Sequence, residues 1–247
     1  MIAADLRVLA DAGTVAAAAA REVAQVLAAA ARAHGSASMA LAGGSTPRGL
    51  YRGLALDHRN DIDWDRVHVY WGDERNVPHD DERSNYRMAR ESLLDHVPVH
   101  QERVHPMPTV LGEPSEAAAE YERTLRSHFD TEWPQFDLVL LGIGDDGHTA
   151  SLFPRSPALD EASRWVVATT APVEPRGRLT LTLPALTHAR AIFVVVAGSS
   201  KADALRCALA DGPDPGCPAS LIRTAHTPVV WWADAEAAAN LGPRSAE

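Results

Sequence analysis

Four short segments combine glycine with polar or charged side chains, and they contain the residues best suited to chemistry. In one of them, His148 follows three glycines and two acids. A neutral imidazole can act as a general base near pH 7, and the glycines favour a tight turn that would present it to a ligand. A lone histidine is more often structural than catalytic, but this setting favours the catalytic interpretation. The four segments read Gly43-Gly44-Ser45-Thr46, Gly72-Asp73-Glu74-Arg75, Gly142-Ile143-Gly144-Asp145-Asp146-Gly147-His148 and Gly198-Ser199-Ser200-Lys201.

Two of these segments have features of a phosphate site. Residues 43–46 combine flexible glycines and hydroxyl donors with a predicted helix N-terminus opened by Pro47, where free N–H groups and the helix dipole favour an anion. An ordinary capped turn is the alternative. Lys201 is the only lysine, and the other 22 of the 23 basic residues are arginine. It falls in the first turn of a predicted helix, where a cation is unfavourable unless it meets an anion, so we expect a phosphate ligand there.

Charged residues beside two further strands are candidates for the same site. Asp73, Glu74 and Arg75 follow an apolar strand, a position that could place a carboxylate beside His148 and a guanidinium on the substrate. A solvated loop is the alternative, above all for Glu74. Arg176 and Arg178 precede an alternating Leu-Thr segment, and one of these arginines could point into the site, with a plain edge-strand charge as the alternative.

Residues 142–147 match the dinucleotide fingerprint Gly-x-Gly-x-x-Gly letter for letter, which would indicate a nicotinamide-dependent oxidoreductase. The context argues against it. Asp145 and Asp146 would face the pyrophosphate, and Pro154 follows too soon for the long helix that should hold that group. We therefore interpret the match as accidental and expect no cofactor.

Three other chemistries are not supported. Pro47 stands where a lipase-type Gly-x-Ser-x-Gly elbow needs its second glycine, and no Gly-Lys-Ser/Thr follows for a Walker loop. His96 and His100 have a metal-like spacing, but Pro98 between them prevents the helix that would place both on one face. We predict neither an activated serine nor a metal site.

The elements that must position these residues predict an α/β fold. Several apolar runs do not alternate with polar residues, which is typical of strands buried on both faces of a parallel sheet. We therefore expect one domain over residues 1–247, with an open, mostly parallel, Rossmann-like sheet covered by helices on both faces. In such sheets ligands bind beyond the carboxyl ends of the strands, where the four segments lie. Expected strands are 38–42, 67–71, 136–143, 191–197 and 229–232; expected helices are 14–34, capped by Thr14 and stopped by Gly35, 48–56, 84–95 and 200–209.

Bulk composition narrows the partners and the compartment. The net charge of −10 argues against nucleic-acid or anionic-membrane binding, so any anionic ligand must be held by concentrated local donors. The two cysteines fit no disulfide framework, and the first thirty residues contain acids that are unlike a signal peptide. We expect a cytoplasmic protein, with a monomer as the default state.

The motifs, taken in order, resemble those of 6-phosphogluconolactonases, in the glucosamine/galactosamine-6-phosphate isomerase superfamily. The likeness runs from about residue 38 to residue 232, and its most specific element is Asp-Gly-His-Thr-Ala-Ser-Leu-Phe-Pro at 146–154. The matching stretches are Leu41 to Pro47, Trp71 to Arg75, Ser84-Asn85-Tyr86, Leu141 to Pro154 and Arg178 to Thr182.

This resemblance implies hydrolysis of 6-phospho-D-glucono-1,5-lactone to 6-phospho-D-gluconate in the oxidative pentose phosphate pathway, with His148 as the base. It also implies phosphate and sugar contacts from the Gly43–Thr46 loop, Arg75 and Lys201, and it adds Asn85 as a substrate-binding candidate.

Two other functions remain as alternatives. Glucosamine-6-phosphate deaminases share the fold and two of the loops, but after the histidine they have an Asn-Glu-Pro element that supplies a carboxylate, where this chain has Ser151-Leu152-Phe153-Pro154. A non-catalytic sugar-phosphate sensor would need a DNA-binding or partner module, and we see no such segment. The lactonase interpretation is preferred.

We hypothesise the following mechanism. The phosphate rests on the Gly43–Thr46 loop and Lys201, which orients the lactone carbonyl near His148. His148 takes a proton from the attacking water, and Asp73 orients the imidazole. Arg75 is the first choice and Arg178 the second to stabilise the developing oxyanion.

Overall fold

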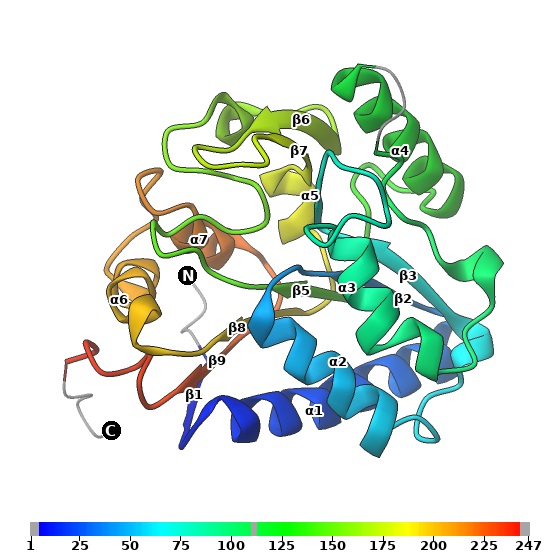
Figure 1. Ribbon diagram of the computed structural model, residues 1–247, viewed down its shortest axis with the longest axis horizontal. Coiled ribbons are helices and arrows are strands. Elements are labelled where there is room, and N and C mark those ends of the chain that lie inside the picture. The colour runs from blue at the N-terminus through cyan, green and yellow to red at the C-terminus, as the bar shows by residue number, and fades with distance from the viewer. Residues whose placement is uncertain (1–4, 110–112, 243–247) are drawn as a thin grey trace.

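The centre of the computed structural model, which describes residues 5–109 and 113–242, is a six-stranded sheet in which every pair of neighbours is parallel (Figure 1). The predicted open, mostly parallel sheet is thereby confirmed. In spatial order its strands are β1 (Asp5–Leu9), β9 (Val229–Asp234), β8 (Ile192–Val196), β5 (Leu138–Leu141), β2 (Ala37–Leu41) and β3 (Val67–Trp71). The edge strand β1 was not predicted.

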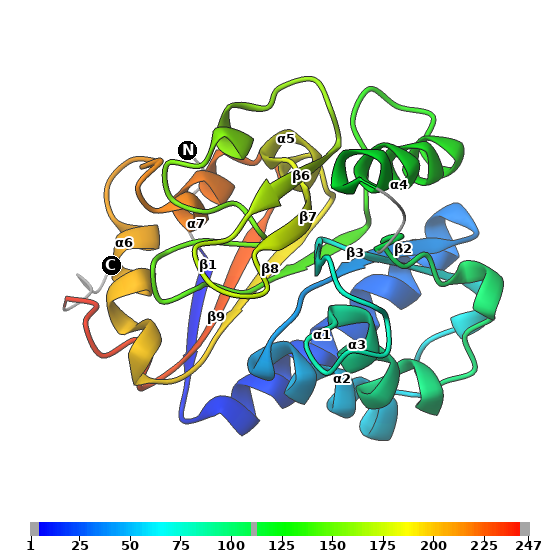
Figure 2. The same cartoon turned by 45° about the horizontal axis from the view of Figure 1, so that its top comes forward.

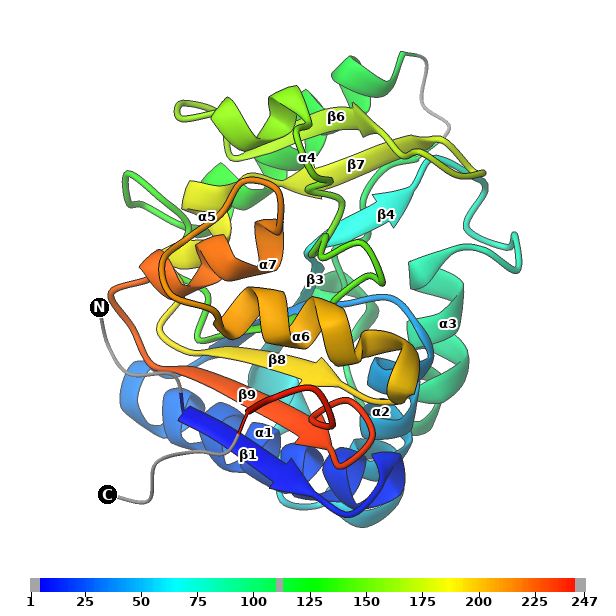
Figure 3. The ribbon, with the colours of Figure 1, turned by 90° about the vertical axis from the view of Figure 1, so that its left-hand side faces the viewer.

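The inner strands are apolar because both of their faces are covered. Every residue of β2, β5, β8 and β9 is buried, including Ser38 and Asp234. Helices α1 and α6 (Ala202–Leu209) lie on opposite sides of β8 and β9 (Figure 3). Apolar and polar residues therefore do not alternate in these strands because both faces of the strands are buried, as expected.

Helix α1 (Ala12–His34) packs against five strands of the sheet. It begins with a capping box in which Asp11 is the N-cap and Thr14 is the third helical residue, so the helix starts earlier than the predicted cap at Thr14. It ends, as predicted, at Gly35, whose φ of 82° suits a glycine. By length and apolar composition alone α1 could cross a membrane, but its apolar face, including Val15 and Leu27, belongs to the core.

The remaining helices flank the sheet and the loops at its carboxyl edge (Figure 2). Helix α2 packs on α1 and on α3, and it begins at Ser45, so that Pro47 is its third residue and not its first. Helix α3 starts one residue after the predicted start, with Ser84 as its N-cap, and a 3₁₀ turn at Leu94–His96 takes the place of the predicted last helical turn. The bounds are α2 (Ser45–Asp57), α3 (Asn85–Ser92), α4 (Pro114–His128), α5 (Leu183–Thr187) and α7 (Pro218–Leu221).

A second, three-stranded antiparallel sheet was not predicted. Its order is β4 (Asp73–Arg75), β7 (Gly177–Leu181) and β6 (Val166–Thr170). Segment 73–75 was expected to be a loop, but it pairs with 178–180 and places Arg75 directly opposite Arg178. One cluster of buried apolar side chains includes residues of both sheets, and we infer from it that the chain forms one domain.

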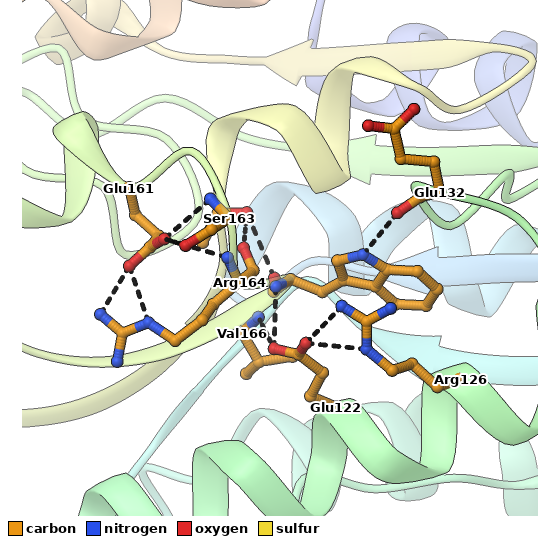
Figure 4. Close-up of polar contacts among 9 residues, drawn as sticks. Glu122, Arg126, Glu132, Glu161, Ser163, Arg164 and Val166 are labelled. Carbon is orange, nitrogen blue, oxygen red and sulfur yellow. Dashed lines mark hydrogen bonds and ion pairs between the residues drawn. The ribbon is translucent and has the colours of Figure 1, made fainter.

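Helix α4 covers the small sheet and is fixed to the start of β6 by Glu122 (Figure 4). One carboxylate oxygen of Glu122 accepts from the backbone N–H groups of Trp165, at 2.8 Å, and Val166, at 3.2 Å, and the other accepts from Arg126. The guanidinium of Arg126 lies 4.2 Å from the centre of the Trp165 ring. This cluster holds β6, and through it the strand that carries Arg178.

Candidate active site

A cavity of about 430 Å³ lies where β2, β5 and β8 end and the small sheet begins. The carboxyl ends of parallel strands meet at this edge, so segments far apart in the sequence converge here. Of the ten predicted site residues, Ser45 and Thr46 do not line the cavity. They start helix α2 beside it, and no side chain in the described part of the chain caps the first N–H groups of that helix. Eight line it: Gly43, Gly44, Asp73, Arg75, Asn85, His148, Arg178 and Lys201.

His148 is held by Asp146 and not by Asp73. Nδ1 of the imidazole lies 2.6 Å from a carboxylate oxygen of Asp146, and the backbone N–H of His148 donates to the same oxygen at 3.1 Å. A carboxylate only accepts, so Nδ1 carries the proton and Nε2 keeps its lone pair. The ring also packs against Phe153, with 4.7 Å between ring centres. The hypothesis that Asp73 orients the imidazole is corrected by these contacts.

Gly144 makes room for this pair. A Cβ atom at Gly144 would lie 2.0 Å from Nδ1 of His148 and 2.7 Å from a carboxylate oxygen of Asp146, both far inside van der Waals contact. The carbonyl oxygen of His148 also accepts from the N–H of Gly144 at 2.8 Å. The glycine therefore serves the placement of the imidazole, whatever its resemblance to a dinucleotide fingerprint.

Asp73 also lines the cavity, but it has other partners. Its carboxylate accepts from the Ser151 hydroxyl at 2.6 Å and from the Asn85 amide at 3.3 Å, and its carbonyl oxygen accepts from Asn85 at 2.9 Å. The Asn85 side chain lies against Gly43, where a Cβ would be 1.9 Å from its oxygen. Asn85 thus joins the loop after β2 to strand β4, a structural task in addition to its predicted contact with substrate.

Glu74 is buried, with 1 % of its surface exposed, so its interpretation as a solvated loop residue is wrong. Its carboxylate accepts from the backbone N–H groups of Arg75, Asn85 and Tyr86 and from the Ser84 hydroxyl. These bonds fix the start of α3 to β4. Burial raises the pKa of Glu74, and the three backbone bonds oppose that shift.

Arg75 and Arg178 present two like charges on neighbouring strands at the cavity. Arg178 is only 7 % exposed, and its Nε and Nη1 atoms have no hydrogen-bond partner among the described residues. Burial lowers the pKa of Arg178, and the nearby charge of Arg75 lowers it further. Arg75 donates to the carbonyl oxygen of Arg83, which also lines the cavity. Like charges placed opposite each other are unfavourable in a sheet, so this arrangement suits an anion that arrives from outside.

Lys201 ends the 3₁₀ turn Ser199–Lys201 that leads into α6, and its Nζ lies 2.6 Å from a carboxylate oxygen of Asp145. Asp145 also accepts from the Ser200 hydroxyl at 3.2 Å. The hydrogen bond from Lys201 holds the pKa of Asp145 below its usual range. The lysine reaches the cavity as predicted, but a phosphate would have to share it with Asp145.

Several lining residues were missed by sequence reasoning. Ser151 and Phe153 lie in the stretch 146–154 and could have been found there, whereas Val173 and Glu174 come from the β6–β7 connection, which had no signal. Within residues 5–109 and 113–242, no group of three or more His, Cys, Asp or Glu side chains could hold a metal ion.

Comparison with known proteins places this chain in a family. A family model described as glucosamine-6-phosphate isomerases/6-phosphogluconolactonase matches residues 10–231. A 6-phosphogluconolactonase of Synechocystis sp. is 43% identical over 213 residues, covering 85% of this chain and 86% of that protein. One of Mycobacterium leprae is 40% identical over 247 residues, covering 97% and 99%.

Solved structures agree. The 6-phosphogluconolactonase of Trypanosoma brucei superposes with a TM-score of 0.86 at 31% identity, covering 97% of this chain and 99% of that chain. A monomeric glucosamine-6-phosphate deaminase superposes with a TM-score of 0.81 at 23% identity, and this likeness concerns the fold alone. The chain belongs to the family of glucosamine-6-phosphate isomerases and 6-phosphogluconolactonases.

Proposed function

We propose that this chain is a lactone-hydrolysing enzyme that converts 6-phospho-D-glucono-1,5-lactone to 6-phospho-D-gluconate in the oxidative pentose phosphate pathway, with His148 activating water. The observation that carries the mechanism is the contact of 2.6 Å between Nδ1 of His148 and Asp146 at the wall of the cavity. It leaves Nε2 as an acceptor, and no described residue forms a hydrogen bond to that atom.

Water attack at the lactone carbonyl follows from this tautomer. Nε2 accepts a proton from the attacking water, and Asp146 stabilises the imidazolium that forms. The water adds to the carbonyl carbon, and when the tetrahedral intermediate collapses the ring oxygen leaves and takes the proton back from Nε2 of the His148 imidazolium, which regenerates the neutral base. A lactone is an activated ester, so general-base help of about 10²- to 10⁴-fold with good positioning suffices.

No covalent serine intermediate is needed. Ser151 is the serine at the cavity, but its hydroxyl donates to Asp73 at 2.6 Å and it is almost fully buried. A nucleophilic serine needs a base that takes its proton, usually a histidine. Asp73 and Ser151 therefore support the wall of the site.

The positive side of the cavity receives the anionic oxygens of the substrate. The uncapped N-terminus of α2, after Gly43 and Gly44, and the ammonium of Lys201 hold the phosphate. Nε and Nη1 of Arg178 have no partner among the described residues, whereas Arg75 already donates to the carbonyl oxygen of Arg83, so Arg178 takes first place as donor to the developing oxyanion. A phosphate-free lactone separates the two roles, because only the oxyanion donor remains important for it.

The deaminase alternative lacks its extra acid here. Residues 149–154 contain no acidic side chain, and the ring of Phe153 occupies the space beside the imidazole. We further propose a cytoplasmic location and a monomer that binds neither nucleic acid nor membranes, in keeping with the charge of −10.

The test compares two products. Freshly generated 6-phosphogluconolactone should release acid faster with the protein than without it, in proportion to enzyme concentration, and glucosamine 6-phosphate should release no ammonia. Ammonia release without lactone hydrolysis would overturn the proposal in favour of the deaminase.

A further inference from the structure

The only two cysteines of the chain lie side by side behind the loop 142–148, which carries His148. Cys217 is the N-cap of α7, and its Sγ lies 3.9 Å from the carbonyl oxygen of Ala204 in α6. Cys207 is three residues after Ala204, on the same face of that helix, so its side chain lies next to the thiol of Cys217. Both thiols are free.

Cys217 supports the turn that presents His148. Gly147 has a φ of 82°, and a Cβ at this glycine would be 2.9 Å from Sγ and 3.3 Å from Cα of Cys217. The N–H of Ala219 donates to the carbonyl oxygen of Gly147 at 2.9 Å. The first residues of α7 are therefore packed and hydrogen-bonded against the residue that precedes the proposed base.

Cys207 lies in helix α6, which starts directly after the cavity residue Lys201. A covalent link between Cys207 and Cys217 would tie the helix that follows Lys201 to the segment that supports His148. Helices α6 and α7 are neighbours in the fold (Figure 3).

We propose that Cys207 and Cys217 form a redox-sensitive pair, and that their oxidation to a disulfide by a small-molecule disulfide lowers the activity of the enzyme. An S–S bond is about 2.05 Å long, so the two free sulfurs must leave their non-bonded packing and approach each other. The sulfur of Cys217 then moves relative to Gly147, and the turn that carries His148 shifts with it.

The chemistry proceeds in two exchange steps. The half-buried Cys207 loses its proton to solvent and attacks one sulfur of the small disulfide, which releases one small thiolate and leaves a mixed disulfide. Cys217 then loses its proton and attacks the Cys207 sulfur, releasing the second small thiol. In total two protein thiols are oxidised and one small disulfide is reduced to two thiols.

The second step should be the slow one. Cys217 is 1 % exposed, and burial raises the pKa of its thiol, so little thiolate is present near pH 7. A mixed disulfide at Cys207 should therefore accumulate first, and ring closure should accelerate as the pH is raised.

The experiment incubates the native chain with oxidised glutathione and follows intact mass, free thiols and activity together. We expect a glutathione adduct that converts to a species about 2 Da lighter than the reduced protein, with both thiols lost. Activity should fall by about tenfold to a hundredfold, since a displacement near 1 Å at a catalytic base has effects of that size. Dithiothreitol should restore it.

Cys207→Ser is the matched control, because it keeps Cys217 against Gly147 but cannot form the bond. It should have native activity and lose none of it with oxidised glutathione. The proposal is overturned if no internal disulfide forms, if the disulfide forms without loss of activity, or if Cys207→Ser is inhibited as strongly as the native chain. The mass and thiol readouts do not depend on the proposed reaction, so they report on the pair even if lactone hydrolysis is not detected.

Discussion

Replacing Gly144 with alanine should damage catalysis while leaving the fold almost unchanged. The new Cβ would lie 2.0 Å from Nδ1 and 2.1 Å from Cε1 of His148, and 2.7 Å from a carboxylate oxygen of Asp146. To reach the 3.4 Å at which ordinary contact begins, the imidazole must move by about 1.4 Å. The atoms that must move are the ends of side chains, and Gly144 has no positive φ, so neither the backbone nor the core is strained.

A displacement of that size at a catalytic base costs about 10²-fold in rate. We therefore expect kcat on 6-phosphogluconolactone to fall by about a hundredfold in Gly144→Ala, with little change in KM or melting temperature. Gly142→Ala is the matched control in the same loop, because its Cβ would meet nothing closer than 3.9 Å, and it should retain native kcat. Native turnover by Gly144→Ala, or equal losses in both variants, would refute the reasoning about the placement of His148.

Three further predictions concern separate parts of the structure. In Asp146→Asn the new amide can donate to Nδ1 of His148, which favours the tautomer with the proton on Nε2. We expect kcat to fall by about 10²-fold or more with KM nearly unchanged. A native kcat would show that another group orients the ring. Lys201→Ala should raise KM for the phosphorylated lactone about tenfold and leave the phosphate-free lactone unaffected, whereas equal damage on both would remove the lysine from the phosphate site. Burial lowers the pKa of His68 and His105 to about 4, so stability should decline as the pH falls from about 6.5 towards 4, because the unfolded chain takes up protons that the folded one rejects. For each histidine the free energy of unfolding should change by at most about 1.4 kcal/mol per pH unit, and by less because both side chains are only half-buried. Urea unfolding at pH 7.5 and at pH 5 measures this change. If stability depended on pH as steeply in His68→Asn as in the native chain, the assignment would be contradicted.

The convergence of the cavity residues could be predicted from the sequence because it follows from a general property of parallel sheets. Gly43, Asp73, His148 and Lys201 are far apart in the chain, yet each follows an apolar run, and the carboxyl ends of such strands share one edge. The glycines, hydroxyl side chains and single lysine that follow these apolar runs were enough to identify the loops that line the site.

The partners of these residues could not be predicted in the same way. Whether Asp73 or Asp146 contacts the imidazole depends on the local turn, and an Asp two residues before the histidine can fold back onto it without any periodic signal. Glu74 was interpreted as solvated because three of the groups that it binds, the Ser84 hydroxyl and the N–H groups of Asn85 and Tyr86, belong to a helix start ten to twelve residues later.

The small sheet was missed for a related reason. Strand β4 has only three residues, and its partner lies about a hundred residues further along the chain, so neither length nor alternation predicts the pairing. The burial of Arg178 and its position opposite Arg75 depend on that pairing and could not be inferred without it.

The central claim is that His148 activates the attacking water, and the kinetics of His148→Ala test it most directly. The variant should hydrolyse 6-phosphogluconolactone with a kcat lowered by about 10²- to 10⁴-fold, while 6-phosphogluconate still raises its melting temperature as it does for the native chain. That combination separates loss of the base from loss of binding or folding. A His148→Ala variant that folds, binds 6-phosphogluconate and turns over the lactone at a near-native rate would contradict the account.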